Sequence, residues 1–289
     1  MIVDSHTHIF PPAFHRDRGK YFTRDATLAE LFAGAETPMA TAQDLIASMD
    51  EAGVDVSVVM GIGWTDMEVA REVNDYLLES AARYPKRLVP FCSVNPAWGE
   101  EALREVERCA DQGARGVGEM HPDTQGFSLS DASVMEPFIG LLRSLRLVLL
   151  THSSEPVGHE YVGKGTVTPG ALMDLIQRAQ DVPIICAHWG GGLPFYALMP
   201  EVQAALQKVY FDSAASPFLY RPRVYSVAMQ LVRPESVLFG SDYPLMKPSR
   251  IIRHIRTASI TDDEKNGILG GNAQRLLGLG KNGTAVTDA

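Results

Sequence analysis

Short apolar runs alternate with segments of helical spacing along almost the whole chain, and this alternation limits the fold more than any other feature. Eight runs read as strands, at residues 2–3, 56–62, 88–94, 114–119, 147–151, 182–187, 209–212 and 237–241. Most are near-continuous stretches of Val, Ile and Leu, as expected for parallel strands covered on both faces. Eight such units in 289 residues predict an α/β protein with a single (β/α)8 TIM barrel over residues 1–280.

The segments between the runs supply the helical half of this pattern. Thr41 is a favourable N-cap for a helix over 42–52, and Gly53 is suited to end it. The remaining helices are predicted over 65–84, 100–112, within 131–144, over 168–180, 194–206 and 219–232, and from 249 onwards. No Gly-x-Gly-x-x-Gly motif follows the first run, which disfavours an open dinucleotide-binding sheet.

Two stretches fall outside the repeating pattern. Residues 9–40 follow the first strand, include Pro11 and Pro12, and are long for a loop in a compact domain. We expect this irregular insertion to lie as a lid over the active-site mouth of the barrel. Residues 281–289 are small and polar, and we predict a frayed tail there.

The composition narrows the functional classes. A net charge of −9 argues against a nucleic-acid partner, because phosphate contacts need a basic face. No apolar run is long enough to span a bilayer, and no secretory signal is recognisable. Three scattered cysteines in apolar surroundings are typical of reduced thiols rather than of disulfides or a cysteine zinc site. We therefore predict a cytoplasmic protein without membrane contact.

Metal-ligating residue types gather where the predicted strands end, which is where TIM barrels place their chemistry. They are His6 and His8 after the first strand, Glu119 and His121 after the fourth, His152 after the fifth, His188 after the sixth and Asp242 after the eighth. A single histidine in such a place is more often a core residue bonded to the backbone. Five of the eight histidines in such places indicate a common site. Imidazole and carboxylate donors without cysteine suit a catalytic divalent metal.

The motifs that contain these residues resemble a known superfamily. They are Asp-Ser-His-Thr-His at 4–8, Thr-His at 151–152, Ala-His-Trp-Gly-Gly at 187–191, Gly-Ser-Asp-Tyr-Pro at 240–244 and Gly-Asn-Ala-Gln-Arg-Leu-Leu at 271–277. In this order they resemble the amidohydrolase superfamily, and within it the amidohydrolase-related (amidohydrolase 2) branch that also contains aminocarboxymuconate-semialdehyde decarboxylase. The resemblance implies a divalent metal, usually zinc with Mn²⁺ or Fe²⁺ as alternatives. It also implies metal ligands at His6, His8, His152 and Asp242, with His188 as an acid/base group.

Glu119 departs from the pattern of that branch. It is similar to the bridging carboxylate of the TatD deoxyribonuclease branch, whose site holds two metals. In that arrangement His188 would be a ligand rather than an acid/base group. We favour one tightly held ion with Glu119 as a further or bridging ligand, and two ions are the alternative.

Three functions are compatible with such a site. We expect a metal-dependent hydrolase that acts on a small amide, ester or lactone, or on a carboxylic acid. In it the metal activates water, Asp242 accepts its proton and His188 stabilises the oxyanion. The alternative is non-oxidative decarboxylation of an unsaturated or aromatic acid, with His188 moving the proton. A ligand-binding barrel without catalysis is a third possibility, and it needs no metal.

Further residues are candidates for binding a small-molecule substrate. Trp64, His121, Trp189 and Tyr243 follow predicted strand ends, and we predict that they bind substrate. Tyr161 lies in a loop on the same side of the barrel. Basic residues of the insertion and later loops could hold a substrate carboxylate, although each also reads as an ordinary surface charge: Arg16, Arg18, Arg24, Lys164, Arg221 and Arg223. Exposed apolar helices could support a homodimer.

Overall fold

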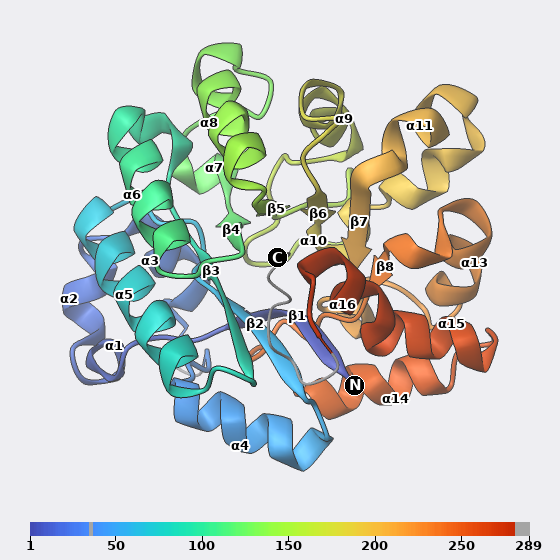
Figure 1. Ribbon diagram of the computed structural model, residues 1–289, viewed down its shortest axis with the longest axis horizontal. Helices are drawn as coiled ribbons and strands as arrows, with labels where there is room; N and C mark the ends of the chain where they lie inside the picture. Colours follow the sequence, from blue (N-terminus) through green and yellow to red (C-terminus); the bar gives the residue numbers. More distant parts are fainter. Residues whose placement is uncertain (35–36, 281–289) are drawn as a thin grey trace.

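Eight parallel strands in the order β1 to β8 form a barrel surrounded by helices in the computed structural model, which describes residues 1–34 and 37–280 (Figure 1). The strands are β1 Val3–His8, β2 Val56–Met60, β3 Leu88–Cys92, β4 Gly116–Met120, β5 Val148–Thr151, β6 Ile184–Cys186, β7 Val209–Asp212 and β8 Val237–Leu238. Backbone hydrogen bonds between β1 and the segment after β8 close the barrel: Ser5 N–H donates to the Phe239 carbonyl oxygen at 2.8 Å, and His8 N–H to that of Tyr243 at 2.7 Å. The predicted (β/α)8 barrel is confirmed.

Helices connect successive strands and cover the outside of the barrel (Figure 1). The longer ones are α4 Ala42–Ala52, α5 Met67–Arg83, α6 Glu100–Asp111, α8 Ala132–Leu145, α9 Pro169–Arg178, α13 Val224–Leu231 and α14 Pro248–Arg256. The shorter ones are α7 Pro122–Gln125, α10 Ala187–Gly190, α11 Pro200–Ala205, α12 Ser216–Leu219, α15 Asp262–Asn266 and α16 Asn272–Leu277. Helix α4 begins with the expected cap, because the Thr41 side chain accepts from the Asp44 N–H.

Three predicted elements differ from the structure, each for a local reason. The helix expected over 194–206 is divided because Met199 is extended before Pro200, as the residue before a proline tends to be. The helix expected over 219–232 begins only at Val224, after an extended Tyr220 and Pro222. Strand β8 ends at Leu238 rather than at 241, in a segment where Asp242 adopts a left-handed conformation with φ of 65°.

The insertion after β1 is more ordered than we predicted. It contains three short helices, α1 Pro12–Arg16, α2 Arg18–Phe22 and α3 Ala26–Phe32. Asp25 anchors it, because one carboxylate oxygen caps α3 at the Leu28 N–H and the other accepts from the backbone of Thr65 and Asp66. Its aromatic residues pack into the core, where the Phe14 ring stacks on Tyr21 at 3.9 Å between centroids. The prediction of a frayed tail at 281–289 lies outside the described residues.

Apolar side chains form two buried layers, as expected for this architecture. One fills the barrel itself and includes Val58, Met60, Phe91, Leu150 and Ile185. The other lies between the strands and the surrounding helices. The three cysteines are buried and not in disulfides, as their sequence context predicted.

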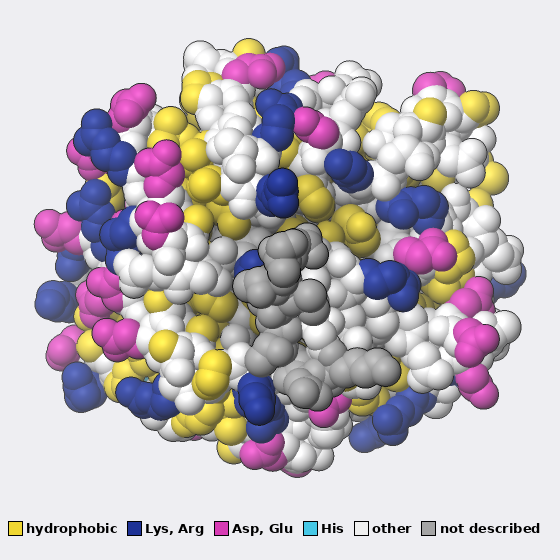
Figure 2. Space-filling model, in the orientation of Figure 1, with side chains coloured by type: hydrophobic (Ala, Val, Ile, Leu, Met, Phe, Trp, Pro, Cys, Tyr) yellow, Lys and Arg dark blue, Asp and Glu magenta, His cyan; other side chains and the backbone are white. Residues whose placement is uncertain are grey.

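The outer surface carries charges of both signs. Figure 2 shows basic and acidic side chains interspersed on the visible face. Among the described residues, no helix is both long and apolar enough to cross a membrane.

Candidate metal centre

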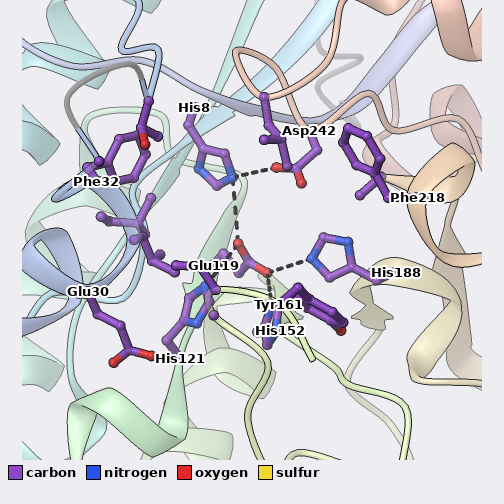
Figure 3. Close-up of a pocket in the computed structure, with 18 of the residues that line it drawn as sticks. His8, Glu30, Phe32, Glu119, His121, His152, Tyr161, His188, Phe218 and Asp242 are labelled. Atoms are coloured by element: carbon purple, nitrogen blue, oxygen red, sulfur yellow. Dashed lines mark hydrogen bonds and ion pairs between the residues drawn. The ribbon is translucent and has the colours of Figure 1, made fainter. Parts of the chain in front are cut away.

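The carboxyl ends of five strands bring the predicted metal ligands together. His6 and His8 belong to β1 and Glu119 to β4. His152 directly follows β5, His188 lies in α10 just after β6, and Asp242 lies four residues beyond the end of β8. All six are buried, and Figure 3 shows the Glu119 carboxylate at the centre of the group. The barrel therefore brings residues from opposite ends of the sequence, such as His6 and Asp242, into one cluster.

Four donor atoms gather at the Oε2 side of Glu119 with spacings close to those of metal ligands. The Nε2 atoms of His6 and His8 are 3.1 Å apart. Asp242 Oδ1 lies 3.7 and 3.4 Å from them, and Glu119 Oε2 lies 3.5 and 3.6 Å from them. Ligands about 2.1 Å from one ion in tetrahedral geometry are separated by about 3.4 Å. Five of the six separations among these atoms are therefore compatible with one tetrahedral ion, and His6, His8 and Glu119 form a group that could hold a metal.

The other oxygen of Glu119 faces a second pair of histidines. Glu119 Oε1 is 3.1 Å from His152 Nδ1 and 3.5 Å from His188 Nε2. These three donors make up a second group that could hold an ion. His152, which the family resemblance placed with His6 and His8, therefore lies across the carboxylate from them. His121 completes the surroundings, with Nε2 3.4 Å from Glu119 Oε2 and its ring stacked on His152 at 4.3 Å.

Hydrogen bonds fix the orientation of the two histidines of β1. His6 Nδ1 is 2.8 Å from Asp212 Oδ2, and His8 Nδ1 is 3.0 Å from the carbonyl oxygen of Gly61. Both partners accept hydrogen bonds, so each Nδ1 donates, and Nε2 is the ring nitrogen left to bind a metal. The structure thus sets both tautomers for metal binding.

Asp212, at the end of β7, is a site residue that the sequence reasoning missed. Besides the His6 bond, its Oδ1 accepts from the backbone N–H groups of His188 at 2.9 Å and Ala214 at 3.0 Å. It therefore orients one proposed ligand and also holds the left-handed backbone of His188, whose φ is 54°. The sequence did contain a signal for Asp212, because it ends an apolar strand as the other site residues do.

Asp4 supports the opposite side of the cluster. Its Oδ1 accepts from the Ser241 N–H at 2.9 Å, directly before Asp242. Its Oδ2 has no partner, and burial raises the pKa of Asp4 to about 7. Asp4 thus positions the turn that carries Asp242 rather than facing the cavity.

Mutual electrostatics strongly shift the ionisation of the cluster. Burial opposes the charge of Glu119, yet His121 and His6 hold its pKa well below the usual range. Burial likewise disfavours a charged His188, but the hydrogen bond with Glu119 and the charge of Asp242 raise its pKa to about 9. Burial and the neighbouring His121 lower the pKa of His152 to about 4. The cluster therefore contains carboxylates that stay ionised and a His152 that stays neutral, both suited to binding a cation.

A cavity of about 640 Å³ opens beside this cluster. Its polar end is formed by His8, Glu119, His121, His152, His188 and Asp242. Its other walls come from the insertion, the β5–α9 loop, α12 and the segment after β8. Residues 30–34, 37 and 38 of the insertion line it, in agreement with a lid at the mouth.

Only some of the residues predicted to bind substrate line this cavity. His121 lines the cavity, and so does Tyr161. Trp64 and Trp189 are fully buried instead, Trp64 against Phe14 and Trp189 with its Nε1–H donating to Ser216 Oγ at 2.6 Å. Neither tryptophan lines the cavity, and Tyr243 does not line it either.

The basic residues considered for a substrate carboxylate are not part of the described cavity walls. Arg24 pairs with Asp66 and Glu68, each at 3.0 Å. Lys164 donates to Glu160 at 3.0 Å and to the carbonyl oxygen of His159 at 3.1 Å. An acid that enters this cavity would therefore meet imidazoles and a metal ion rather than a guanidinium or ammonium group.

Comparison with known proteins gives a consistent result. A family model described as amidohydrolase matches residues 3–279, which confirms the resemblance seen in the motifs. 2-Amino-3-carboxymuconate-6-semialdehyde decarboxylase of Dictyostelium discoideum is 24% identical over 248 residues, with 75% of this chain and 68% of the relative covered. 6-Methylsalicylic acid decarboxylase of Penicillium expansum is 25% identical over 291 residues, with 87% of each covered.

A solved structure shares the fold. Dihydroxybenzoic acid decarboxylase from Polaromonas sp. JS666 superimposes with a TM-score of 0.74 at 19% identity, with 97% of this chain and 98% of that chain covered. That structure contains manganese and the inhibitor 2-nitroresorcinol.

The prediction of a hydrolase is wrong, because these relatives are decarboxylases. The same ligands serve both reactions, since a divalent metal can polarise either a carbonyl group or the oxygens of an acid. Motifs that specify the ligands therefore do not specify which bond breaks. A divalent metal fits the donors, whereas nothing in the donor set singles out zinc.

Proposed function

The chain belongs to the amidohydrolase family, and from this membership we propose that it is a metal-dependent, non-oxidative decarboxylase of a small aromatic or unsaturated acid. One observation carries the proposal: a ligand set for a divalent metal lines a largely apolar cavity in a chain whose relatives are decarboxylases. In the reaction the bond between a carbon atom and the carboxylate breaks. Carbon dioxide leaves, and a proton takes its place without consumption of water.

We assign the metal to His6, His8, Asp242 and Glu119 Oε2, whose spacing suits one ion. Manganese and zinc both accept two imidazoles and two carboxylates, so metal analysis must identify the ion. When bound, the ion would hold oxygen atoms of the substrate and withdraw negative charge from them.

His188 is the proposed proton donor. It lines the cavity, and its Nδ1 donates to the carbonyl oxygen of Ala214 at 3.3 Å, which leaves Nε2 towards the site. Asp242 and Glu119 favour the protonated ring, so that a proton is available for the carbon that loses carbon dioxide. His121, from β4, lines the same region and is proposed to bind the carboxylate or a neighbouring hydroxyl group of the substrate.

A second, weaker ion is part of this proposal. Glu119 Oε1, His152 and His188 offer three donors instead of four, and they share the carboxylate with the first ion. Occupation of this place would use the Nε2 of His188 and so remove the proton donor. One ion therefore supports the reaction, and excess metal is expected to inhibit it.

The test uses metal-loaded protein and a panel of 2-hydroxybenzoic and unsaturated acids in deuterated water. Release of carbon dioxide, together with deuterium on the carbon that carried the carboxylate, is the expected result. A protein stripped with a chelator should be inactive and should recover on addition of Mn²⁺ or Zn²⁺. Product that contains oxygen from labelled water and no carbon dioxide would reject the proposal.

A further inference from the structure

The walls of the cavity beyond the metal cluster limit which acids fit. We infer that the substrate is an aromatic acid with a single carboxylate whose ring carries an apolar substituent in the outer part of the cavity. This inference rests on the proposed decarboxylase function and specifies its substrate class.

The cavity is larger than a one-ring acid requires. Its volume of about 640 Å³ lies within the range of about 300–1,000 Å³ that is typical of sites for drug-sized ligands. The metal cluster occupies only one end, so a ring bound there leaves the outer part unfilled. A substituent that points away from the carboxylate would extend into this space.

Apolar side chains from separate elements meet at the outer part. Val162 of the β5–α9 loop, Phe218 of α12 and Leu245 after β8 line it while remaining 72%, 50% and 50% exposed, respectively. Leu31 and Phe32 of α3 face them from the insertion. Exposed apolar groups that converge on one opening mark a surface that binds an apolar partner. Here the cavity continues to the metal cluster, so that partner is part of the substrate.

The charges around the outer part disfavour a second carboxylate. Among the described lining residues none is Lys or Arg, and Glu30 is the one carboxylate outside the metal cluster. Figure 3 shows Glu30 on the same side of the cavity as His121. A second carboxylate there would lose water, find no cation and meet a like charge. His159 and Tyr161 line the same wall and bring no Lys or Arg charge to it.

Two cations close to lining residues are engaged elsewhere. Lys164 is bonded to Glu160 and to the His159 backbone. Arg250 lies with its guanidinium carbon 5.4 Å from the centre of the Phe218 ring and is not a lining residue. The wall thus presents the Phe218 ring, and not the Arg250 charge, to the cavity.

Binding of analogues that cannot react tests this inference. Calorimetry on manganese-loaded protein would compare 2-nitrophenols, in which a nitro group replaces the carboxylate, with hydrogen, methyl, ethyl, propyl or carboxylate at one further ring position. Each added methylene should tighten binding about three- to four-fold until the outer part is filled. The carboxylate analogue should bind at least about ten-fold more weakly than the ethyl analogue.

A pair of variants at one lining position makes the test specific. Phe218→Arg places a cation in the outer wall and should improve binding of the carboxylate analogue at least about ten-fold. Phe218→Leu keeps the wall apolar and should preserve the order of the alkyl series. If Phe218→Arg does not fold, Leu245→Arg introduces the charge from another element.

Each outcome separates the two proposals. An alkyl series with no increase in affinity, or equal binding of the carboxylate and ethyl analogues, would overturn the inference about substituents. Carbon dioxide release is measured separately on the corresponding acids. The predicted order of binding without carbon dioxide from any of the acids would support the inference about the cavity and overturn the proposed reaction.

Discussion

Replacement of Asp212 by Asn is the sharpest test of how the site is built. The two oxygens of Asp212 accept three hydrogen bonds, from His6 Nδ1 at 2.8 Å and from the N–H groups of His188 and Ala214 at 2.9 and 3.0 Å. An asparagine has only one oxygen, so its NH₂ group must face a donor in either orientation. If the NH₂ group faces His6, the ring must carry its proton on Nε2 and loses the lone pair that binds metal.

The size of the effect follows from these contacts. Leaving a buried donor without an acceptor costs about 1–3 kcal/mol, and at least one donor is affected. We therefore expect the metal-free variant to lose about 2–4 kcal/mol of its free energy of unfolding, because charge-assisted bonds are lost as well. Loss of a partner that orients a metal ligand typically weakens metal affinity about 10- to 100-fold.

Two measurements check this prediction: urea denaturation in the presence of a chelator, and competition of the folded protein with a chelator for Mn²⁺. Asp181→Asn is the matched control, since Asp181 is an exposed carboxylate paired with Arg143. It should change stability by less than about 1 kcal/mol and leave metal affinity unaltered. A folded Asp212→Asn protein with metal affinity within two-fold of the wild type would refute the assigned role of Asp212.

Three further predictions concern the ions, the proton donor and a structural carboxylate. Dialysed protein should retain one equivalent of metal, and millimolar metal should add a second equivalent and lower the rate of carbon dioxide release. Activity that rises steadily with metal concentration would contradict an inhibitory second ion at Glu119, His152 and His188. His188→Gln should lower kcat about 10²- to 10⁴-fold while metal analysis still finds the first ion, and an unchanged kcat would reject His188 as the donor. Glu105 is buried, which alone would raise its pKa, but Arg108 and Asn74 bond to it and lower the pKa below its ordinary value. Its stabilising contribution is therefore present above about pH 4.5 and is lost as the pH falls through the depressed value. Glu105→Gln should lower the free energy of unfolding by about 2–4 kcal/mol at pH 7, and the difference from wild type should shrink in acid. Urea denaturation of both proteins at pH 7 and in acid measures this difference in the free energy of unfolding. A difference that does not change with pH would show that the charge of Glu105 does not contribute.

The barrel, and the end of it that carries the candidate site, were predictable from local features of the sequence. Apolar runs bounded by helical segments repeat along the chain, and a parallel strand covered on both faces leaves this signature whatever its neighbours are. The position of a polar residue after such a run then determines which end of the barrel it occupies. That reasoning gathered His6, His8, Glu119, His152, His188 and Asp242 into one cluster, although their metal-binding roles remain proposals.

Only the tertiary structure decided how these residues face one another and what surrounds them. Glu119 directs its two oxygens at different histidine pairs, and this depends on the register of β4 against β3 and β5 and on closure of the barrel, which brings β1 opposite to it. Trp64 and Trp189 follow strands as His121 does, yet they lie buried in the core, because backbone conformation decides which side of a turn reaches the cavity. The walls come from α3, α12 and two loops that are far apart in the sequence, so their apolar character emerges only when the chain folds. Sequence order places chemistry at one end of a strand, whereas packing between elements determines which atoms meet there.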